Sequence, residues 1–428
     1  MKTIFNSVIT MLRNDHASVM KNFFSLTFLK GLEYLVPLIL VPYLVRTLGL
    51  ERYGIVQSAV SFMYIFYIIT NFGFNYSAAR QISVYRDNPD MSSKIAGAIL
   101  VLKSILMFIS FFIMLGIALT IPSLNAELGL IILTFGFIVG DVLFPVWLYQ
   151  GYEKMFYLSR FQIIARIILF ILTILLIKSP SDYLYYPMIY YGSQILMSIS
   201  TLAYARKLLG VKISLPTVDI LKQEFILALK PFFSSIAQVL YTQPRLFYVS
   251  LIATPMMTGA FAIADKAAGV FQLFPAWLFI ISALPRLSYM FEHEQDKCLQ
   301  TLSMYQKWTF VYAIIMTPIA LITAPWIIYV FSGQFHEEAT FMFRILCFET
   351  FILTANIFLI HYFPISGNYG VFAKIYGLTC IATLSLFALL IPIYGVYGLL
   401  AGIIASSIIL LILTLYFRSK ENLTVSMQ

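Results

Sequence analysis

The chain has 428 residues, of which 61% are hydrophobic and only 11% are charged. An ordinary soluble domain carries about 25% charged residues, so this composition excludes a soluble fold and indicates that apolar side chains face lipid. The formal net charge of +9 does not indicate nucleic-acid binding, because no basic run exceeds the pair Arg206 and Lys207. Membrane proteins commonly retain Lys and Arg on their cytoplasmic side, which explains the excess.

Residues 1–22 do not resemble a cleaved signal peptide, because no long apolar core and no small-residue cleavage site are present. We expect a cytoplasmic lead that lies on the membrane surface. Its apolar face would contain Ile4, Phe5, Val8 and Leu12. A disordered tail is the alternative.

Twelve apolar segments are long enough, at about 20 residues, to span a membrane as helices. They are Phe23–Val45, Tyr53–Tyr76, Ile95–Leu119, Leu128–Gln150, Phe156–Ile177, Leu184–Ala205, Glu224–Ile252, Thr258–Ser282, Trp308–Phe331, Phe341–Phe363, Phe372–Ile391 and Val396–Phe417. The longest polar break divides them six and six. We therefore expect an N-lobe at 23–210, a cytoplasmic linker at 211–222, a C-lobe at 223–417 and a cytoplasmic tail at 418–428.

The distribution of basic residues gives the orientation. Eighteen Lys and Arg residues lie in the tails and in the loops on the side of the N-terminus, whereas the opposite loops hold only Arg46, Arg52 and Lys178. The positive-inside rule predicts that both termini are cytoplasmic, which requires an even number of spans.

Polar side chains recur along two of the predicted spans at helical spacing, so each set lies on one face. The sets are Gln57, Ser61, Tyr64, Asn71 and Asn75 in the second span, and Ser234, Gln238, Tyr241, Arg245 and Tyr248 in the seventh. Polar faces within lipid point to protein or to a water-filled cavity. Hydrogen bonds between packed helices are the alternative.

Charged residues also lie inside the spans. Lys30 and Glu33 share a face of the first span, where they form either a permanent intrahelical pair or one that a ligand can separate. Lys103, Arg166 and Lys230 lie near enough to the cytoplasmic side to extend toward water. The carboxylates that could carry a proton are Glu33, Asp141, Asp265 and Glu349, and structural pairing is the alternative for each.

The three cysteines and four histidines are scattered, so we expect no metal site and no cofactor, and coupling to H+ or Na+ is left open.

Three segments carry a family resemblance. NFGFNYSAARQIS (71–83), FPVWLYQGYEKM (144–155) and LVPYLVRTLGLERYGIVQSA (40–59) resemble the O-antigen, or Wzx-type, flippases. These form the polysaccharide branch of the multidrug/oligosaccharidyl-lipid/polysaccharide exporter superfamily. The resemblance implies an all-α integral membrane protein with two six-helix lobes in a V, around a cavity lined by spans one, two, seven and eight.

The resemblance also implies a transporter rather than an enzyme. Its substrate would be an oligosaccharide on undecaprenyl pyrophosphate, moved from the cytoplasmic to the periplasmic leaflet of the bacterial inner membrane during lipopolysaccharide synthesis. The partners would be this lipid-linked substrate, membrane lipids, a polysaccharide polymerase and a chain-length regulator.

On this basis we expect two sets of binding residues. Cationic side chains attract a pyrophosphate, and we assign this role to Lys30, Arg245 and Lys266. Amide and hydroxyl groups suit sugars, and we assign that role to Gln57, Ser61, Asn71, Asn75, Gln238 and Tyr241. The alternatives are a cation-coupled drug antiporter of the same superfamily and a membrane polysaccharide polymerase or ligase. A polymerase or ligase would need a large periplasmic loop, and none is expected here.

Overall fold

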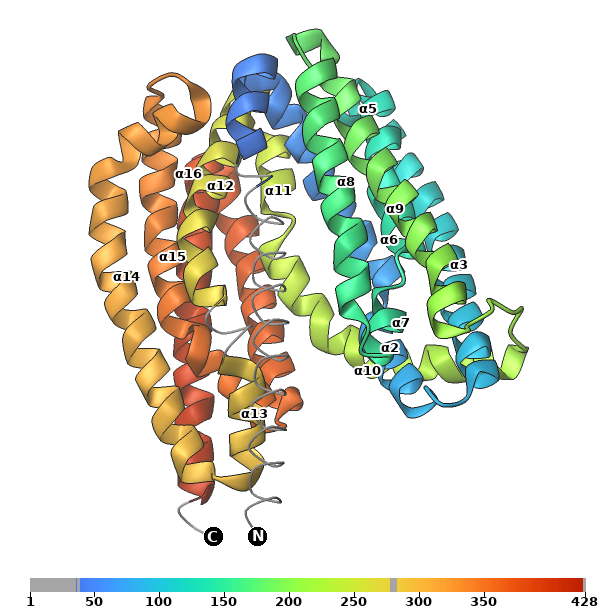
Figure 1. The fold of residues 1–428 in the computed structure, drawn as a ribbon. Coiled ribbons are helices and arrows are strands. Elements are labelled where there is room, and N and C mark those ends of the chain that lie inside the picture. Colours follow the sequence, from blue (N-terminus) through green and yellow to red (C-terminus); the bar gives the residue numbers. More distant parts are fainter. Residues whose placement is uncertain (1–35, 37–38, 278–282, 426–428) are drawn as a thin grey trace, which may run out of the picture.

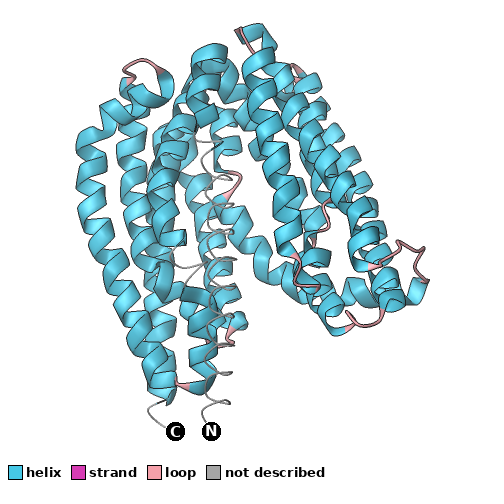
Figure 2. Cartoon of the chain, viewed as in Figure 1, coloured by secondary structure: helices cyan, strands magenta, loops and turns pink. Residues whose placement is uncertain are grey.

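The computed structural model describes residue 36 and residues 39–277 and 283–425. The regular elements of these residues are all helices (Figure 2). Residues 39–71 are helical, and a positive φ of 79° at Gly49 separates 39–48 from 50–71. The helices that follow are α2 Phe74–Val84, α3 Pro89–Thr120, α4 Pro122–Asn125, α5 Leu128–Thr134, α6 Gly136–Leu143, α7 Val146–Gly151, α8 Met155–Leu176, the 3-10 helix η1 Pro180–Leu184, α9 Tyr185–Leu209, α10 Val218–Thr242, α11 Arg245–Ile252, α12 Pro255–Trp277, α13 Leu284–His293, α14 Gln295–Ser332, α15 Glu337–Ile365 and α16 Tyr369–Val425.

The helices have the length and hydropathy of membrane spans. Among the described residues, 7 helices pass this test, or 8 if the bent α10 is included. Two of them, Ile39–Val84 and Tyr369–Lys420, contain 46 and 52 residues. Each contains a glycine with positive φ, Gly49 and Gly395, at which the chain turns. The prediction of an all-helical membrane protein is therefore confirmed. The predicted number of twelve spans stays a prediction.

The helices form two groups that meet at the end opposite the C-terminal end of α16 and spread apart toward that end (Figure 1). One group contains residues 51–71 and α2–α9, and the other contains α11–α16. Helix α10 contacts α2 and α3 of the first group and α16 of the second, so it bridges the two. The predicted segment boundaries stay predictions.

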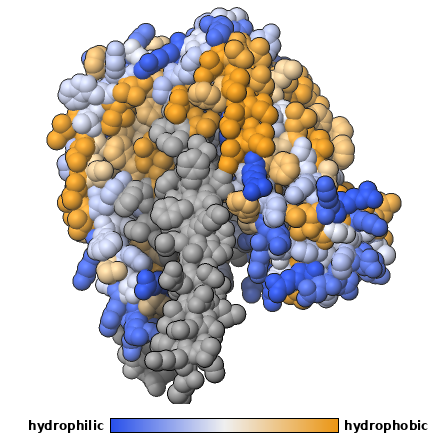
Figure 3. Space-filling view, viewed as in Figure 1, coloured by the Kyte–Doolittle hydropathy of each residue, from blue (hydrophilic) through white to orange (hydrophobic). Residues whose placement is uncertain are grey.

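Apolar side chains cover the outside of both groups. Figure 3 shows them over the upper and middle part of the visible face, while hydrophilic residues gather at the lower ends. Phe108 and Phe112 on α3 and Ile322 on α14 are among the large exposed side chains. Such an extensive apolar surface is what lipid contact requires, because soluble proteins rarely expose contiguous patches of this kind.

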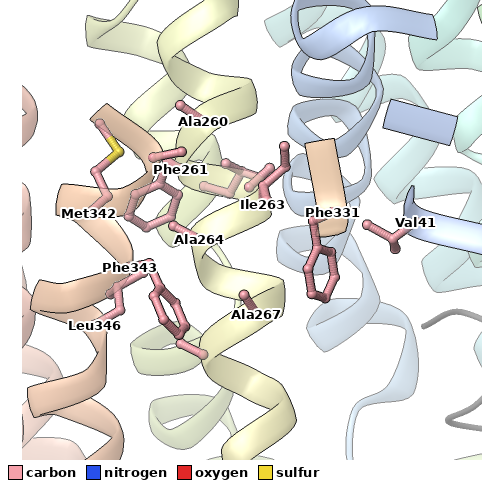
Figure 4. Close-up of a cluster of buried hydrophobic side chains, with 14 of the residues drawn as sticks. Val41, Ala260, Phe261, Ile263, Ala264, Ala267, Phe331, Met342, Phe343 and Leu346 are labelled. Atoms are coloured by element: carbon pink, nitrogen blue, oxygen red, sulfur yellow. The ribbon is translucent and has the colours of Figure 1, made fainter. Parts of the chain in front are cut away.

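Inside the second group, small residues allow close helix packing. Ala260, Ala264 and Ala267 of α12 face Met342 and Phe343 of α15 (Figure 4). The alanines leave room for the aromatic ring, so the two helices interlock as a packed interior requires. This packing holds α12 and α15 in fixed register beside the cavity described below.

Two predicted spans are interrupted, and the first interruption corrects a predicted polar stripe. Phe72 (φ 43°) and Gly73 (φ 76°) end the second span before α2 begins, so Asn75 does not continue the helical face of residues 57–71. The seventh span bends by 48° between residues 233 and 236, close to Pro231, and breaks again before Pro244. A proline removes a backbone donor and disfavours helix in the residue before it, which explains the second break.

The turn between α8 and α9 offers a test of pH dependence. The Asp182 carboxylate accepts hydrogen bonds from the Lys178 and Ser179 backbone N–H groups at 3.0 and 2.9 Å, and these lower its pKa. Because the folded pKa is depressed, the stabilisation is present above the unfolded pKa and is lost as pH falls through the folded pKa.

We expect Asp182→Asn to lower the thermal midpoint of the detergent-solubilised protein by roughly 1 °C at pH 7. The difference should shrink below about pH 4. The exposed Asp87→Asn should show neither effect, and an unchanged midpoint for Asp182→Asn at pH 7 would contradict the prediction.

Candidate functional site

A cavity of about 620 Å³ lies between the two helix groups. The resemblance implied walls from spans one, two, seven and eight, and all four contribute, through residues 41, 57–64, 238–246 and 262–273. Helix α15 adds Glu349 and Leu353, which the sequence did not predict to face the cavity.

The charges of the cavity are divided unequally between the groups. Arg245, Asp265, Lys266 and Glu349 all come from α11, α12 and α15 of the second group. On the other side, residues 57–64 contribute Gln57, Val60, Ser61 and Tyr64, which are uncharged. Among the described residues, the cavity therefore has one charged wall and one neutral polar wall.

Arg245 is the centre of the charged wall. One guanidinium nitrogen, Nη1, donates to both carboxylate oxygens of Glu349 at 2.8 Å, and Nη2 lies 2.5 Å from Asp265 Oδ1. The planar guanidinium group suits two carboxylates, because its five N–H donors form a fixed fork. The Glu349 side chain is only 5% exposed, whereas Arg245 and Asp265 are 21% and 22% exposed. Arg245 is thus paired, yet it remains accessible from the cavity.

The pairing of Arg245 could not be read from the helical stripe that predicted its face. The available signal was that Arg245, Asp265 and Glu349 are all charges inside spans. Charges at that depth need partners or water. Lys266 is exposed and lines the same cavity beside Asp265.

Several of the predicted sugar-binding residues also converge here. Gln57, Ser61, Gln238 and Tyr241 line the cavity. The Ser61 hydroxyl accepts from the Phe247 N–H at 3.1 Å and donates to the Gln243 carbonyl at 2.9 Å. It therefore bridges the break before Pro244, where backbone groups have lost their helical partners. Ser61 has a structural role whatever else it binds.

Other predicted residues lie elsewhere. The Asn71 amide donates to the Tyr67 hydroxyl at 2.8 Å, and neither Asn71 nor Asn75 lines the cavity. Asp141 pairs with Lys103 inside the first group, at 3.0 Å. Lys30 and Glu33 lie outside the described residues.

Lys103 corrects a further expectation. Its side chain is 0% exposed, so it does not extend toward water as we expected from the sequence. Its Nζ also donates to the Asp141 carbonyl at 3.2 Å. That carbonyl accepts from the Phe144 N–H at 3.1 Å, one residue earlier than in a regular helix, because residue 145 is proline and has no N–H. The buried lysine therefore adds a second donor to this carbonyl at the break between α6 and α7.

A sequence model of the family described as polysaccharide biosynthesis protein matches residues 19–291, which is more than half of the chain. The chain belongs to the polysaccharide biosynthesis protein family. This confirms the family resemblance that the three sequence motifs indicated.

Two relatives of this polysaccharide biosynthesis protein carry the name "Putative O-antigen transporter". The one from Escherichia coli (strain K12) is 31% identical over 171 residues, which cover 40% of this chain and 41% of that protein. The one from Shigella dysenteriae is 24% identical over 405 residues, which cover 92% of this chain and 98% of that protein.

Two solved structures are similar in fold to this family member. The lipid II flippase MurJ in an inward closed conformation gives a TM-score of 0.71 at 15% identity, covering 92% of this chain and 87% of MurJ. An inward-facing multidrug resistance MATE family transporter of the MOP superfamily gives 0.63 at 12% identity, covering 90% of this chain and 98% of that chain. The predicted MATE-like architecture is therefore confirmed as a fold.

Proposed function

We propose that this chain is a flippase for an oligosaccharide carried on undecaprenyl pyrophosphate. It would move the head group from the cytoplasmic to the periplasmic leaflet of the bacterial inner membrane by alternating access. The observation that carries the proposal is the cavity between the groups, with its charged and its neutral polar wall. A hydrated anionic head group needs such a path, because an unpaired charge in hydrocarbon costs many kcal/mol. The names of the two relatives support this substrate class.

The unequal walls support an orientation for the head group. The pyrophosphate would lie against α11 and α12, where Arg245 and Lys266 provide positive charge. The sugars would lie against the neutral wall and Gln238, where amide and hydroxyl groups can exchange hydrogen bonds with water for bonds with sugar. Lys30 would be a third cation, and Asn71 and Asn75 would contact sugars outside the cavity.

The proposed topology has twelve spans and cytoplasmic termini. The turns at Gly49 and Gly395 support it, since each divides a helix too long for one passage across about 30 Å of hydrocarbon. The excess of Lys and Arg in the loops on the side of the termini supports the orientation.

Substrate binding and ion coupling would both involve Arg245. A phosphate oxygen that takes the place of Asp265 or Glu349 would leave that carboxylate unpaired in a confined site. An unpaired carboxylate in such a site favours a proton. This supports coupling to H+, with Na+ at the same carboxylates as the alternative, and Glu33 as a further candidate.

A flippase-deficient strain tests the proposal. Expression of this chain together with its own glycosyltransferases should restore surface O-antigen, seen as a ladder when a polymerase and a chain-length regulator are present. The matched control is the same strain with an empty vector. Absence of O-antigen, with this chain present in the membrane, would count against the proposal.

A drug antiporter is the second candidate, because the MATE fold and the cavity carboxylates would suit an organic cation. The same cells should be loaded with ethidium. Accelerated efflux without O-antigen export would favour the antiporter.

A further inference from the structure

The short helix at residues 39–48 lies between the two groups at the end opposite the C-terminal end of α16 (Figure 1). The Tyr43 hydroxyl donates to the Ile177 carbonyl at 2.7 Å, at the end of α8 in the first group. Three residues later, Arg46 Nη2 donates to the Val330 carbonyl at 2.7 Å, in the last turn of α14 in the second group. The last carbonyls of a helix have no partner within it. One short helix therefore caps two helices that belong to different groups.

Apolar packing follows the same path. Leu40, Val41 and Leu44 belong to one buried cluster with Leu169 of α8 and Phe331 of α14. Figure 4 shows Val41 beside Phe331. The helix is thus held by both groups through its side chains as well as through the two caps.

The backbones of the two groups also touch at this end. A Cβ atom at Gly54 would lie 2.5 Å from the Gly259 nitrogen and 2.6 Å from the Pro255 oxygen. A Cβ atom at Gly259 would overlap the Leu50 carbonyl oxygen. Gly54 belongs to the first group and Gly259 to α12 of the second. Only glycine permits this approach, since the obstructing atoms are backbone and cannot rotate away.

We infer that Tyr43, Arg46, Gly54 and Gly259 form an outer clasp that seals the cavity on the side away from the termini. The inference rests on the alternating-access mechanism proposed above. To open on that side, the groups must separate between Gly54 and Gly259. The helix at 39–48 must then leave either α8 or α14, because it cannot follow both. These four residues position the two groups and need not touch the substrate.

The clasp explains a pattern in the sequence. The segments that open the second and eighth spans, ERYGIVQ and MMTGAFA, each place one glycine in their first turns. Gly54 and Gly259 are these glycines, and they face each other across the seal. The glycine that these two segments share therefore has a physical reason.

A cysteine reporter measures the state of the clasp without any sugar substrate. Val60→Cys places a thiol in the cavity, in a chain whose buried Cys298, Cys347 and Cys380 are replaced by serine. A membrane-impermeant maleimide is applied to right-side-out and to inside-out vesicles. With the clasp intact, labelling should occur only from the side of the termini.

Gly259→Leu should raise labelling from the opposite side about tenfold or more, because the side chain prevents closure. The matched control is Gly129→Leu, at an exposed glycine near the same end with nothing within 4 Å, and it should leave labelling unchanged. Unchanged labelling in a membrane-inserted Gly259→Leu chain would overturn the inference.

If Gly259→Leu does not reach the membrane, the double variant Tyr43→Phe and Arg46→Met decides the question. It removes both caps with little change in volume, and we expect a several-fold rise from the side opposite the termini. If labelling from that side does not rise, the inference is overturned. Because labelling requires no oligosaccharide, a failed clasp and a failed flippase assignment give different results.

Discussion

Arg245→Ala should reduce surface O-antigen by about 100-fold or more, while the chain still reaches the membrane. The loss has two physical sources. The cavity loses its central cation for the pyrophosphate, and the two carboxylates paired with the guanidinium group, Asp265 and Glu349, are left facing an anionic substrate. Arg245→Lys should recover only part of the export, because one ammonium group cannot reproduce the fork that reaches both carboxylates. The measurement is the amount of O-antigen on intact cells.

Loss of export could also follow from instability, since Glu349 is nearly buried and would lose its partner. The double variant Arg245→Gln and Glu349→Gln separates the two effects, because it removes the buried charge together with its partner. We expect the double variant to accumulate normally and still to lack export. Arg344→Ala is the matched control, since Arg344 is exposed on α15 outside the cavity. Normal export by the double variant would refute the assignment of Arg245 to the pyrophosphate.

Hydropathy predicted the helices well because it depends on each segment separately. A run of about 20 apolar residues must satisfy its backbone internally when lipid surrounds it, so it is helical whatever its neighbours are. The interruption at Phe72 was not predictable in this way. A positive φ is unusual for an aromatic residue, and Phe72 is held there by stacking on Phe225 and Phe232 of α10, which lie far away in the sequence.

The candidate site shows the same limit. Helical periodicity placed Gln57 and Ser61 on one face and Gln238 and Arg245 on another, and all four line the cavity. Periodicity identifies faces within one helix but not which faces meet. The bond from Arg245 to Glu349 spans 104 positions, and the bond from Lys103 to Asp141 spans 38. These pairs depend on the assembled helices, so the sequence offered several candidate carboxylates without their partners.

Asp141 is the candidate carboxylate for which a structural role and a role in proton coupling can be distinguished most directly. Lys103→Met should lower the free energy of unfolding by about 3–5 kcal/mol, because it leaves Asp141 unpaired inside the first helix group. It also removes one of the two donors to the Asp141 carbonyl, which keeps the Phe144 N–H. Lys94→Met, at an exposed lysine on the same helix, should cost little. Thermal or denaturant unfolding of the detergent-solubilised chain measures the difference.

The double variant Lys103→Met and Asp141→Leu then distinguishes a structural pair from a proton carrier. Replacing both members of a buried ion pair with apolar residues is often neutral, so stability should return close to that of the unmodified chain. If the pair is structural, export should return as well and should respond to the proton gradient as before. If stability returns while export stays absent, Asp141 itself takes part in coupling, and the carboxylates beside Arg245 are not sufficient. A single Lys103→Met chain with unchanged stability would instead show that Asp141 is hydrated and needs no partner.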